Sequence, residues 1–185
     1  MSATSPVLDA TRTALLIVDV QNGFVTDETA PIVPAIARLL EGPATRLDLV
    51  VATRFVNRPG SPYERFMDWR ALSSSPDIDL HPAILSRLGR NATVLDKSGY
   101  SAYGSEMRVL LFRLGIDTVL LCGIDTEGCV LASAIALFDA GYRPVMLADL
   151  CASTGGPAHH EAGLLVARRL LGAAQILGSD ALEDD

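Results

Sequence analysis

Short apolar runs alternate along this chain with longer segments in which apolar residues recur at helical spacing. The short runs, typical of buried strands, cover residues 14–18, 47–55, 92–95, 118–122 and 145–148, and more weakly 174–177. The longer, helical patterns cover residues 31–41, 104–114, 126–140 and 158–171. Strands that alternate with helices of this length are joined by crossover connections and pair in parallel. The pattern therefore predicts a doubly wound, three-layer α/β domain with a mainly parallel sheet.

Residues 57–81 interrupt this alternation. The segment contains three prolines, three consecutive serines and the aromatic stretch 63–69, and it follows the second predicted strand. Long connections of this kind are commonly lids or binding loops. We therefore expect residues 57–81 to fold over the edge of the sheet at which that strand ends.

The length and charge of the chain limit the classes of protein to which it can belong. With 185 residues, of which 49% are hydrophobic, the chain fits one domain over residues 1–185, with frayed tails at 1–12 and 178–185. A net charge of −7 and a pI of about 4.9 argue against a nucleic-acid partner. No apolar run approaches the roughly 18 residues that span a bilayer, and residues 1–13 lack the pattern of a signal peptide. We expect a cytoplasmic protein with no membrane partner.

Three cysteines without a C-x-x-C pair form neither a disulfide framework nor a zinc site. Cys122 and Cys151 fall in or beside apolar strand patterns and are interpreted as structural thiols. Cys129 differs, because it follows a glycine-containing turn and opens the helical pattern at 126–140. Unpaired N–H groups at a helix start favour an anion and lower the pKa of a thiol, and they could also hold an oxyanion. The alternative is that Cys129 is inert packing, as a single cysteine after a strand usually is.

Two further polar residues follow apolar runs. Asp19 ends the first run and Lys97 follows the third. If these runs are parallel strands, Asp19, Lys97 and Cys129 all lie at carboxyl ends, the edge at which open α/β sheets place their sites. Singly, Asp19 has the alternative of a turn residue and Lys97 that of a solvated loop charge. The coincidence of all three at one edge favours a catalytic site.

Most of the aromatic residues fall in loops after strands: Phe24, Tyr63, Phe66, Trp69, Tyr100 and Tyr103. This distribution predicts a site with flat apolar walls that suits a small organic substrate. An alternative for Phe66 and Trp69 is packing at a subunit interface. From these loops and strand ends we expect the following residues to bind the substrate: Gln21, Phe24, Asn57, Trp69, Tyr100 and Tyr103.

With these residues placed, the chain resembles the isochorismatase-like cysteine hydrolases over residues 14–177. The matching motifs are LLIVDVQNGF at 15–24, KSGYSAY at 97–103 and GIDTEGCV at 123–130. The resemblance implies a six-stranded parallel sheet and a catalytic triad of Asp19, Lys97 and Cys129. It also implies a cis peptide between Ile124 and Asp125, which would turn the N–H groups of Asp125 and Cys129 toward an oxyanion. The resemblance and the aromatic loop together suggest a homodimer or homotetramer.

The sequence departs from particular members of this family, and these differences limit the reactions that we expect it to catalyse. Nicotinamidases of this family bind a metal through an Asp and two His after the second strand, whereas residues 53–57 here read TRFVN and only His81 is near. We therefore expect no metal and no other cofactor. Isochorismatases proper lack the nucleophilic cysteine, so its presence favours cleavage of an amide, carbamoyl or ureide C–N bond. His159 and His160 are interpreted as surface or helix-start residues.

These expectations define a thiol amidohydrolase in which Asp19 takes the proton of Cys129 and Cys129 attacks the carbonyl carbon. The alternative is a non-catalytic binding protein of the same fold. A redox role for Cys129 is a weaker hypothesis, because the sequence offers no obvious resolving cysteine. A phosphatase loop of the C-x5-R type is excluded, because Ile135 stands where the arginine would be required. One of the arginines in or just before residues 57–81 could bind a substrate carboxylate: Arg54, Arg58, Arg65 or Arg70.

Overall fold

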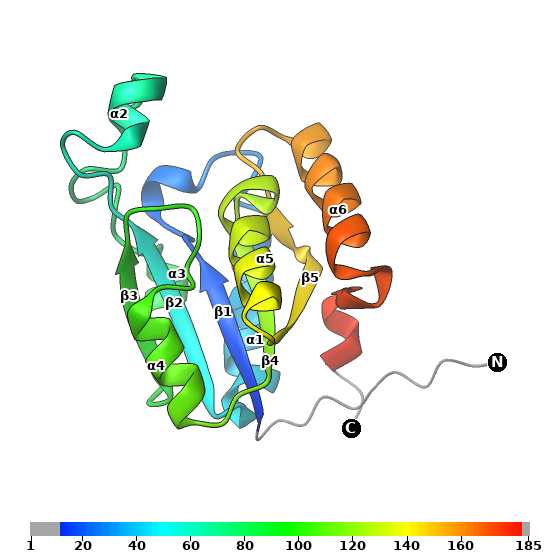
Figure 1. Ribbon diagram of the computed structural model, residues 1–185. Helices are drawn as coiled ribbons and strands as arrows, with labels where there is room; N and C mark the ends of the chain where they lie inside the picture. Colours follow the sequence, from blue (N-terminus) through cyan, green and yellow to red (C-terminus); the bar gives the residue numbers. More distant parts are fainter. Residues whose placement is uncertain (1–11, 183–185) are drawn as a thin grey trace.

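The computed structural model describes residues 12–182 and has one six-stranded sheet, in the order β3-β2-β1-β4-β5-β6 (Figure 1). The strands are β1 (Thr13–Val18), β2 (Leu49–Phe55), β3 (Ala92–Lys97), β4 (Thr118–Ile124), β5 (Arg143–Ala152) and β6 (Ile176–Leu177). All five neighbouring pairs are parallel, which confirms the predicted doubly wound α/β architecture. From β1 the chain adds β2 and then β3 on one side, whereas β4, β5 and β6 lie on the other side of β1. The strand order therefore reverses between β1 and β4.

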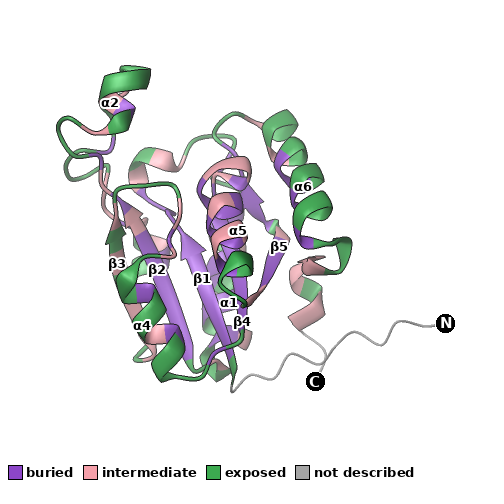
Figure 2. Ribbon diagram, in the orientation of Figure 1, coloured by how far each residue is buried: buried purple, intermediate pink, exposed green. Residues whose placement is uncertain are grey.

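Helices cover both faces of the sheet: α1 (Ile32–Glu41), α3 (Pro82–Leu85), α4 (Ser105–Arg113), α5 (Leu131–Asp139) and α6 (Pro157–Leu171). Helix α2 (Pro62–Met67) lies outside these two layers. In β1, Leu16 and Val18 pack into one core with α4, α5 and α6, while Leu15 and Ile17 pack into the other with α1 and α3. Side chains alternate between faces along a strand, so the continuous apolar run of β1 is explained by burial on both sides. Figure 2 shows this burial along the central strands.

Strand bounds differ from the sequence prediction by one or two residues in several strands, and the differences at β5 and β6 bear on the argument. β5 continues through Cys151 to Ala152, because a register shift against β4 lets Gly123 and Ile124 pair with these two residues. Cys151 therefore lies inside the strand. β6 has only two residues and follows a 3₁₀ turn at Ala173–Gln175, so half of the predicted 174–177 strand is turn.

The predicted frayed tails are partly wrong. Residues 1–11 and 183–185 lie outside the described part of the chain. Arg12, however, forms an ion pair of 2.7 Å with Asp117. Near the other end, Ser179–Leu182 forms a 3₁₀ turn in which the Ser179 N–H and hydroxyl donate to the Asp149 carboxylate at 2.8 and 2.5 Å. The side-chain carboxylates of Asp117 and Asp149 thus hold residues that composition alone marks as tail.

The excursion at 57–81 carries α2, which stands above the carboxyl ends of β2 and β3 (Figure 1). Ser61 caps α2 by accepting a hydrogen bond from the Glu64 N–H at 3.2 Å. Its aromatic and apolar side chains form a small third core of Phe55, Tyr63 and Leu72. This core anchors the segment to the sheet edge where the candidate residues lie. Among residues 12–182, the structure contains no helix with the length and apolar character of a membrane span.

Candidate active site

The three candidate residues come from three strands and meet at one edge of the sheet. Asp19 directly follows β1, Lys97 is the last residue of β3, and Cys129 lies in the turn between β4 and α5. The Lys97 Nζ lies 2.6 Å from the Asp19 Oδ2 and 3.3 Å from the Cys129 Sγ. It also donates to the Gly99 carbonyl at 2.9 Å. One ammonium group therefore joins the carboxylate to the sulfur.

The Asp19 carboxylate is fully buried and is held by Thr53. The Thr53 hydroxyl donates to the Asp19 Oδ1 at 2.7 Å and accepts from the Asp19 N–H at 3.2 Å. Asp19 itself has a φ of +52°, the left-handed region that a side chain other than glycine rarely adopts. Among the described residues, Oδ2 accepts no hydrogen bond in addition to its ion pair with Lys97. This oxygen keeps the capacity to accept a proton.

The turn that carries Cys129 is a single π-type turn, Thr126–Val130, and not the first turn of an α-helix. Gly128 has non-helical angles, φ −102° and ψ −107°, so α5 begins only at Leu131 and the predicted helix over 126–140 is shortened. The Ile124–Asp125 peptide is cis. The N–H groups of Gly128 and Val130 both donate to the Asp125 carbonyl at 3.1 Å, which closes the turn beneath the sulfur.

The expected lowering of the Cys129 pKa is wrong. Burial, and then the negative charge of Asp19, raise the pKa of the thiol well above its ordinary value, although Lys97 acts in the opposite direction. Only 8% of the residue is exposed. The helix-start argument considered local backbone charge and left out the cost of burying a thiolate. Burial and the neighbouring Asp19 carboxylate thus oppose formation of a thiolate at Cys129.

Polar residues that follow β5, together with one from α6, hydrogen-bond to the same turn. Thr154 donates from its N–H and hydroxyl to the two Asp125 carboxylate oxygens at 2.6 and 3.0 Å. The Ser153 hydroxyl donates to the Glu127 Oε1 at 2.7 Å. His160 lies with its Nδ1 2.8 Å from the Thr126 hydroxyl. His160 lies in the first turn of α6, as expected for a helix-start residue. It also contacts the turn that carries Cys129, and the separation of the two segments in sequence gave no sign of this contact.

A cavity of about 320 Å³ opens beside the sulfur. Its lining residues are Phe24, Phe55, Tyr63, Met67, Trp69, Tyr100, Asp125, Gly128, Cys129 and Thr154. Three of the residues expected to bind substrate are among them: Phe24, Trp69 and Tyr100. Phe55, Met67 and the buried ring of Tyr63 were missed as binding residues, although the placement of aromatic residues after strands was the signal that could have found Tyr63.

Gln21 and Asn57 do not line this cavity, which corrects their expected role. The Gln21 amide is fully buried and donates to the carbonyls of Phe55 and Ile78, both at 2.9 Å, while its Oε1 accepts from the Phe55 N–H at 2.7 Å. Asn57 donates to the carbonyls of Trp69 and Ala71 at 3.0 and 3.1 Å. All three hydrogen bonds of the Gln21 amide and both hydrogen bonds donated by the Asn57 amide go to main-chain groups, while the Asn57 Oδ1 accepts from the Ser61 hydroxyl at 2.6 Å. The two amides position the aromatic wall instead of contacting a substrate.

Tyr103 also lies away from the cavity. Its ring packs edge-on against Tyr142 with centroids 5.8 Å apart, on the surface beside α4. Phe66 points outward with 74% of its surface exposed, and the Arg65 guanidinium lies 5.0 Å over its ring. The remaining aromatic residues after strands therefore divide between the cavity wall and the outer surface.

Among residues 12–182, the structure brings together no group of three His, Cys, Asp or Glu side chains that could hold a metal ion. His81 instead caps α3 by accepting from the Ala83 N–H at 3.2 Å. Of the two other cysteines, Cys122 is fully buried in β4 and Cys151 is buried in β5, which fits structural thiols.

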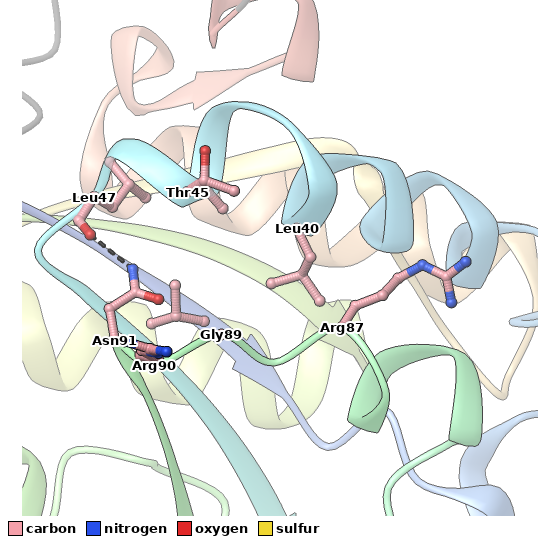
Figure 3. Close-up of a pocket in the computed structure, with 9 residues that line it drawn as sticks. Leu40, Thr45, Leu47, Arg87, Gly89, Arg90 and Asn91 are labelled. Atoms are coloured by element: carbon pink, nitrogen blue, oxygen red, sulfur yellow. Dashed lines mark hydrogen bonds between the residues drawn. The ribbon is translucent and has the colours of Figure 1, made fainter.

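A second cavity, of about 360 Å³, lies at the opposite, amino-terminal ends of β2 and β3 (Figure 3). Two of the polar side chains that line it are hydrogen-bonded within the protein. The Arg87 Nε donates to the Glu41 Oε1 at 2.6 Å, and the Asn91 amide donates to the Leu47 carbonyl at 2.7 Å. No cysteine is among the residues that line it.

Comparison with known proteins identifies the family. Residues 13–178 match the model of the isochorismatase domain. The isochorismatase family protein YwoC of Bacillus subtilis is 28% identical over 175 residues, which cover 85% of this chain and 86% of that protein. Maleamate amidohydrolase of Pseudomonas putida is 27% identical over 172 residues, or 83% of this chain and 78% of that protein.

Among solved structures, N-carbamoylsarcosine amidase from Thermoplasma acidophilum superposes with a TM-score of 0.78 at 26% identity, covering 91% of this chain and 97% of that one. Relatives named as amidohydrolase and amidase support hydrolysis of a C–N bond as the class of activity. Since the family model matches nearly the whole described chain, the protein belongs to the isochorismatase family of hydrolases.

Proposed function

We propose that this protein is a cysteine hydrolase that cleaves the C–N bond of a small amide, carbamoyl compound or ureide through a thioester. The observation that carries the proposal is the ammonium of Lys97, 2.6 Å from the Asp19 carboxylate and 3.3 Å from the Cys129 sulfur, at the mouth of an aromatic cavity. The amidohydrolase and amidase names of the relatives support the same class of reaction.

In the proposed mechanism the Cys129 thiol gives its proton to the free lone pair of Asp19 as the sulfur bonds to the carbonyl carbon. The raised pKa of the thiol favours this concerted transfer over a standing thiolate. The carbonyl oxygen becomes an oxyanion, which the N–H groups of Asp125 and Cys129 stabilise. Both residues line the cavity.

Asp19 then passes its proton to the departing nitrogen, and the C–N bond breaks to leave an acyl thioester on Cys129. A water molecule next gives a proton to Asp19 and its oxygen attacks the thioester carbon. Collapse of this second intermediate releases the acid and returns the proton to the sulfur. Throughout, Lys97 keeps a positive charge beside the carboxylate and the sulfur, which stabilises the negative charge that moves between them.

The test is a panel of small amides, carbamoyl compounds and ureides assayed for ammonia release, with Cys129→Ala as the blank. We expect turnover by the wild type and a loss of about 10⁴-fold or more in the variant. Cys151→Ala is the matched control, because this thiol is buried in β5 away from the cavity and its removal leaves the triad in place.

A second measurement addresses the thioester. Hydroxylamine added during turnover attacks an acyl thioester and yields a hydroxamate in place of the acid. Hydroxamate formation that disappears in Cys129→Ala supports the mechanism. Turnover by Cys129→Ala at the wild-type rate would remove Cys129 as the nucleophile, and absence of turnover across the panel would favour the non-catalytic binding protein.

We also propose that residues 57–81 act as the binding loop, because Tyr63, Met67 and Trp69 from this segment line the cavity. Self-association into a homodimer or homotetramer is part of the proposal. The apolar side chains exposed on α4 support it, among them Phe112 at 84% exposure. Light scattering coupled to size-exclusion chromatography measures the mass directly, and a monomer at micromolar concentration would contradict this part.

A further inference from the structure

Aromatic rings make up half of the ten residues that line the cavity beside Cys129. Phe24 and Trp69 lie nearly parallel, with centroids 6.2 Å apart and an interplanar angle of 18°. Tyr63 meets the edges of Trp69 and Tyr100 at 5.9 and 5.2 Å. Such mutual contacts fix the rings before any ligand arrives. The shape they define suits a flat apolar group.

The residues that line the cavity carry little charge, and that charge is negative. Among the residues that line the cavity, Asp125 carries the only charged side chain, and both of its oxygens are held by Thr154. Burial raises the pKa of the Tyr63 hydroxyl, so this group faces a ligand as a neutral phenol. The nearby ammonium of Lys97 is engaged by Asp19, the Gly99 carbonyl and Cys129.

The arginines of the excursion and the preceding strand do not supply a counter-charge, which answers the expectation that one of them binds a substrate carboxylate. Arg54 makes two hydrogen bonds to the Asp96 carboxylate at 2.7 and 3.0 Å. Arg70 donates to Asp68 at 3.2 Å, and Arg65 lies over the outward ring of Phe66. No arginine is among the residues that line the cavity.

A carboxylate placed in this cavity would lose its hydration without gaining a cation. Burial of an unpaired charge is strongly unfavourable, and the Asp125 carboxyl would add repulsion. An uncharged ring loses little hydration there and gains contact with five aromatic side chains. The volume of about 320 Å³ lies at the lower end of ligand pockets, which limits the occupant to about one ring with its amide.

We propose that the substrates are small uncharged carboxamides with a flat apolar body, and that amides bearing a carboxylate are rejected. This inference rests on the proposed amide hydrolysis and concerns the charge of the molecule hydrolysed. It separates this chain from the relative named for maleamate, whose name denotes a carboxylate-bearing amide.

The test compares two amides of nearly equal shape and different charge, 3-nitrobenzamide and 3-carbamoylbenzoate. We expect kcat/KM for the uncharged amide to exceed that of the anion by about 100-fold or more. Equal or faster turnover of the anion would overturn the inference and leave amide hydrolysis intact.

A variant at the cavity rim tests whether charge is the cause. Met67 lines the cavity and is 62% exposed, so its replacement does not disturb a core. Met67→Lys supplies the missing cation, and we expect it to raise kcat/KM for the anion relative to the uncharged amide by about fivefold. Met67→Gln is the control of similar length without the charge. An unchanged ratio in Met67→Lys would show that charge does not set the preference.

Binding separates failure of this inference from failure of the proposed function. Trp69 is the only tryptophan of the chain and lines the cavity, so its fluorescence reports ligand binding in Cys129→Ala, where no turnover occurs. Tighter binding of 3-nitrobenzamide than of 3-carbamoylbenzoate supports the inference, even if the wild type hydrolyses neither and the hydrolase proposal falls. Equal or tighter binding of the anion overturns the inference, as does the absence of binding by both.

Discussion

The two ends of the sheet each hold a cavity of similar size and carry different chemistry. The amino-end cavity is the larger, about 360 against 320 Å³, yet its Arg87 and Asn91 are both bonded within the protein. At the carboxyl end, Asp19 keeps an oxygen that accepts no hydrogen bond among the described residues, next to a thiol. The two cavities thus differ little in volume and clearly in the polar groups that lie beside them.

A carboxylate paired with a cation lies beside each cavity, and the two pairs differ in burial. Asp19 is fully buried with Lys97, whereas the side chains of Glu41 and Arg87 are 57% and 35% exposed. Water screens the exposed pair and leaves the buried pair unscreened. Removal of a charge should therefore matter at one end of the sheet and hardly at all at the other.

The largest expected effect is on catalysis by Asp19→Asn. The amide cannot accept the Cys129 proton, so we expect kcat to fall by about 10²–10⁴-fold. Steady-state ammonia release measures it. Glu41→Gln, the same chemical change in the amino-end pair, should leave kcat at the wild-type value. Near-normal turnover by Asp19→Asn would remove this carboxylate from the mechanism.

A smaller effect, on folding, distinguishes the buried amide of Gln21 from the partly buried amide of Asn91. Gln21 makes three hydrogen bonds to main-chain groups near the active site, and Asn91 makes one near the amino-end cavity. We expect Gln21→Leu to lower the free energy of unfolding by about 2–5 kcal/mol, because two carbonyls and one N–H lose their partner. Urea denaturation measures this change.

Asn91→Leu is the matched control for Gln21, with an expected loss of about 1–2 kcal/mol. If Gln21→Leu keeps wild-type stability and only raises KM, Gln21 contacts the substrate and the assignment to main-chain support is wrong.

The third expected effect is on the titration of the thiol. The negative charge of Asp19 helps to raise the pKa of Cys129, and Lys97 lowers it. In Asp19→Asn the raising charge is gone and the lowering charge remains, so the pKa of Cys129 should fall. The midpoint of the pH profile for alkylation at Cys129, read by mass spectrometry, should move to lower pH. A midpoint that stays or rises would contradict the arrangement of charges described here, and Glu41→Gln should not move it.

The smallest expected effect comes from Arg87→Ala. This change breaks a partly exposed ion pair in the amino-end cavity, so we expect a loss of at most about 1 kcal/mol in the free energy of unfolding. The value of kcat/KM should not change, because Arg87 lies at the opposite end of the sheet from Cys129. Thermal denaturation and amide turnover check the two parts, and a large fall in kcat/KM would give the amino-end cavity a part in the reaction.

Hydrophobic periodicity along the chain determined the architecture and the edge at which the candidate residues lie. Leu15, Leu16, Ile17 and Val18 mark a strand buried on both faces, and the residue after such a strand falls at the carboxyl edge wherever the helices pack. For this reason Asp19, Lys97 and Cys129 could be placed together from the sequence alone. Resemblance to the family added the cis peptide at Ile124–Asp125.

Only the tertiary structure decided how these groups behave. The Asp19 carboxylate depends on Thr53, and the Phe55 ring near Lys97 depends on Gln21, in each case across 34 residues of sequence. The pKa of Cys129 depends on burial by segments that no local pattern describes. Periodicity encodes which face of an element is buried, because burial of apolar side chains is local and repetitive. Hydrogen-bond partners and desolvation arise where distant segments meet, so they exist only in the folded chain.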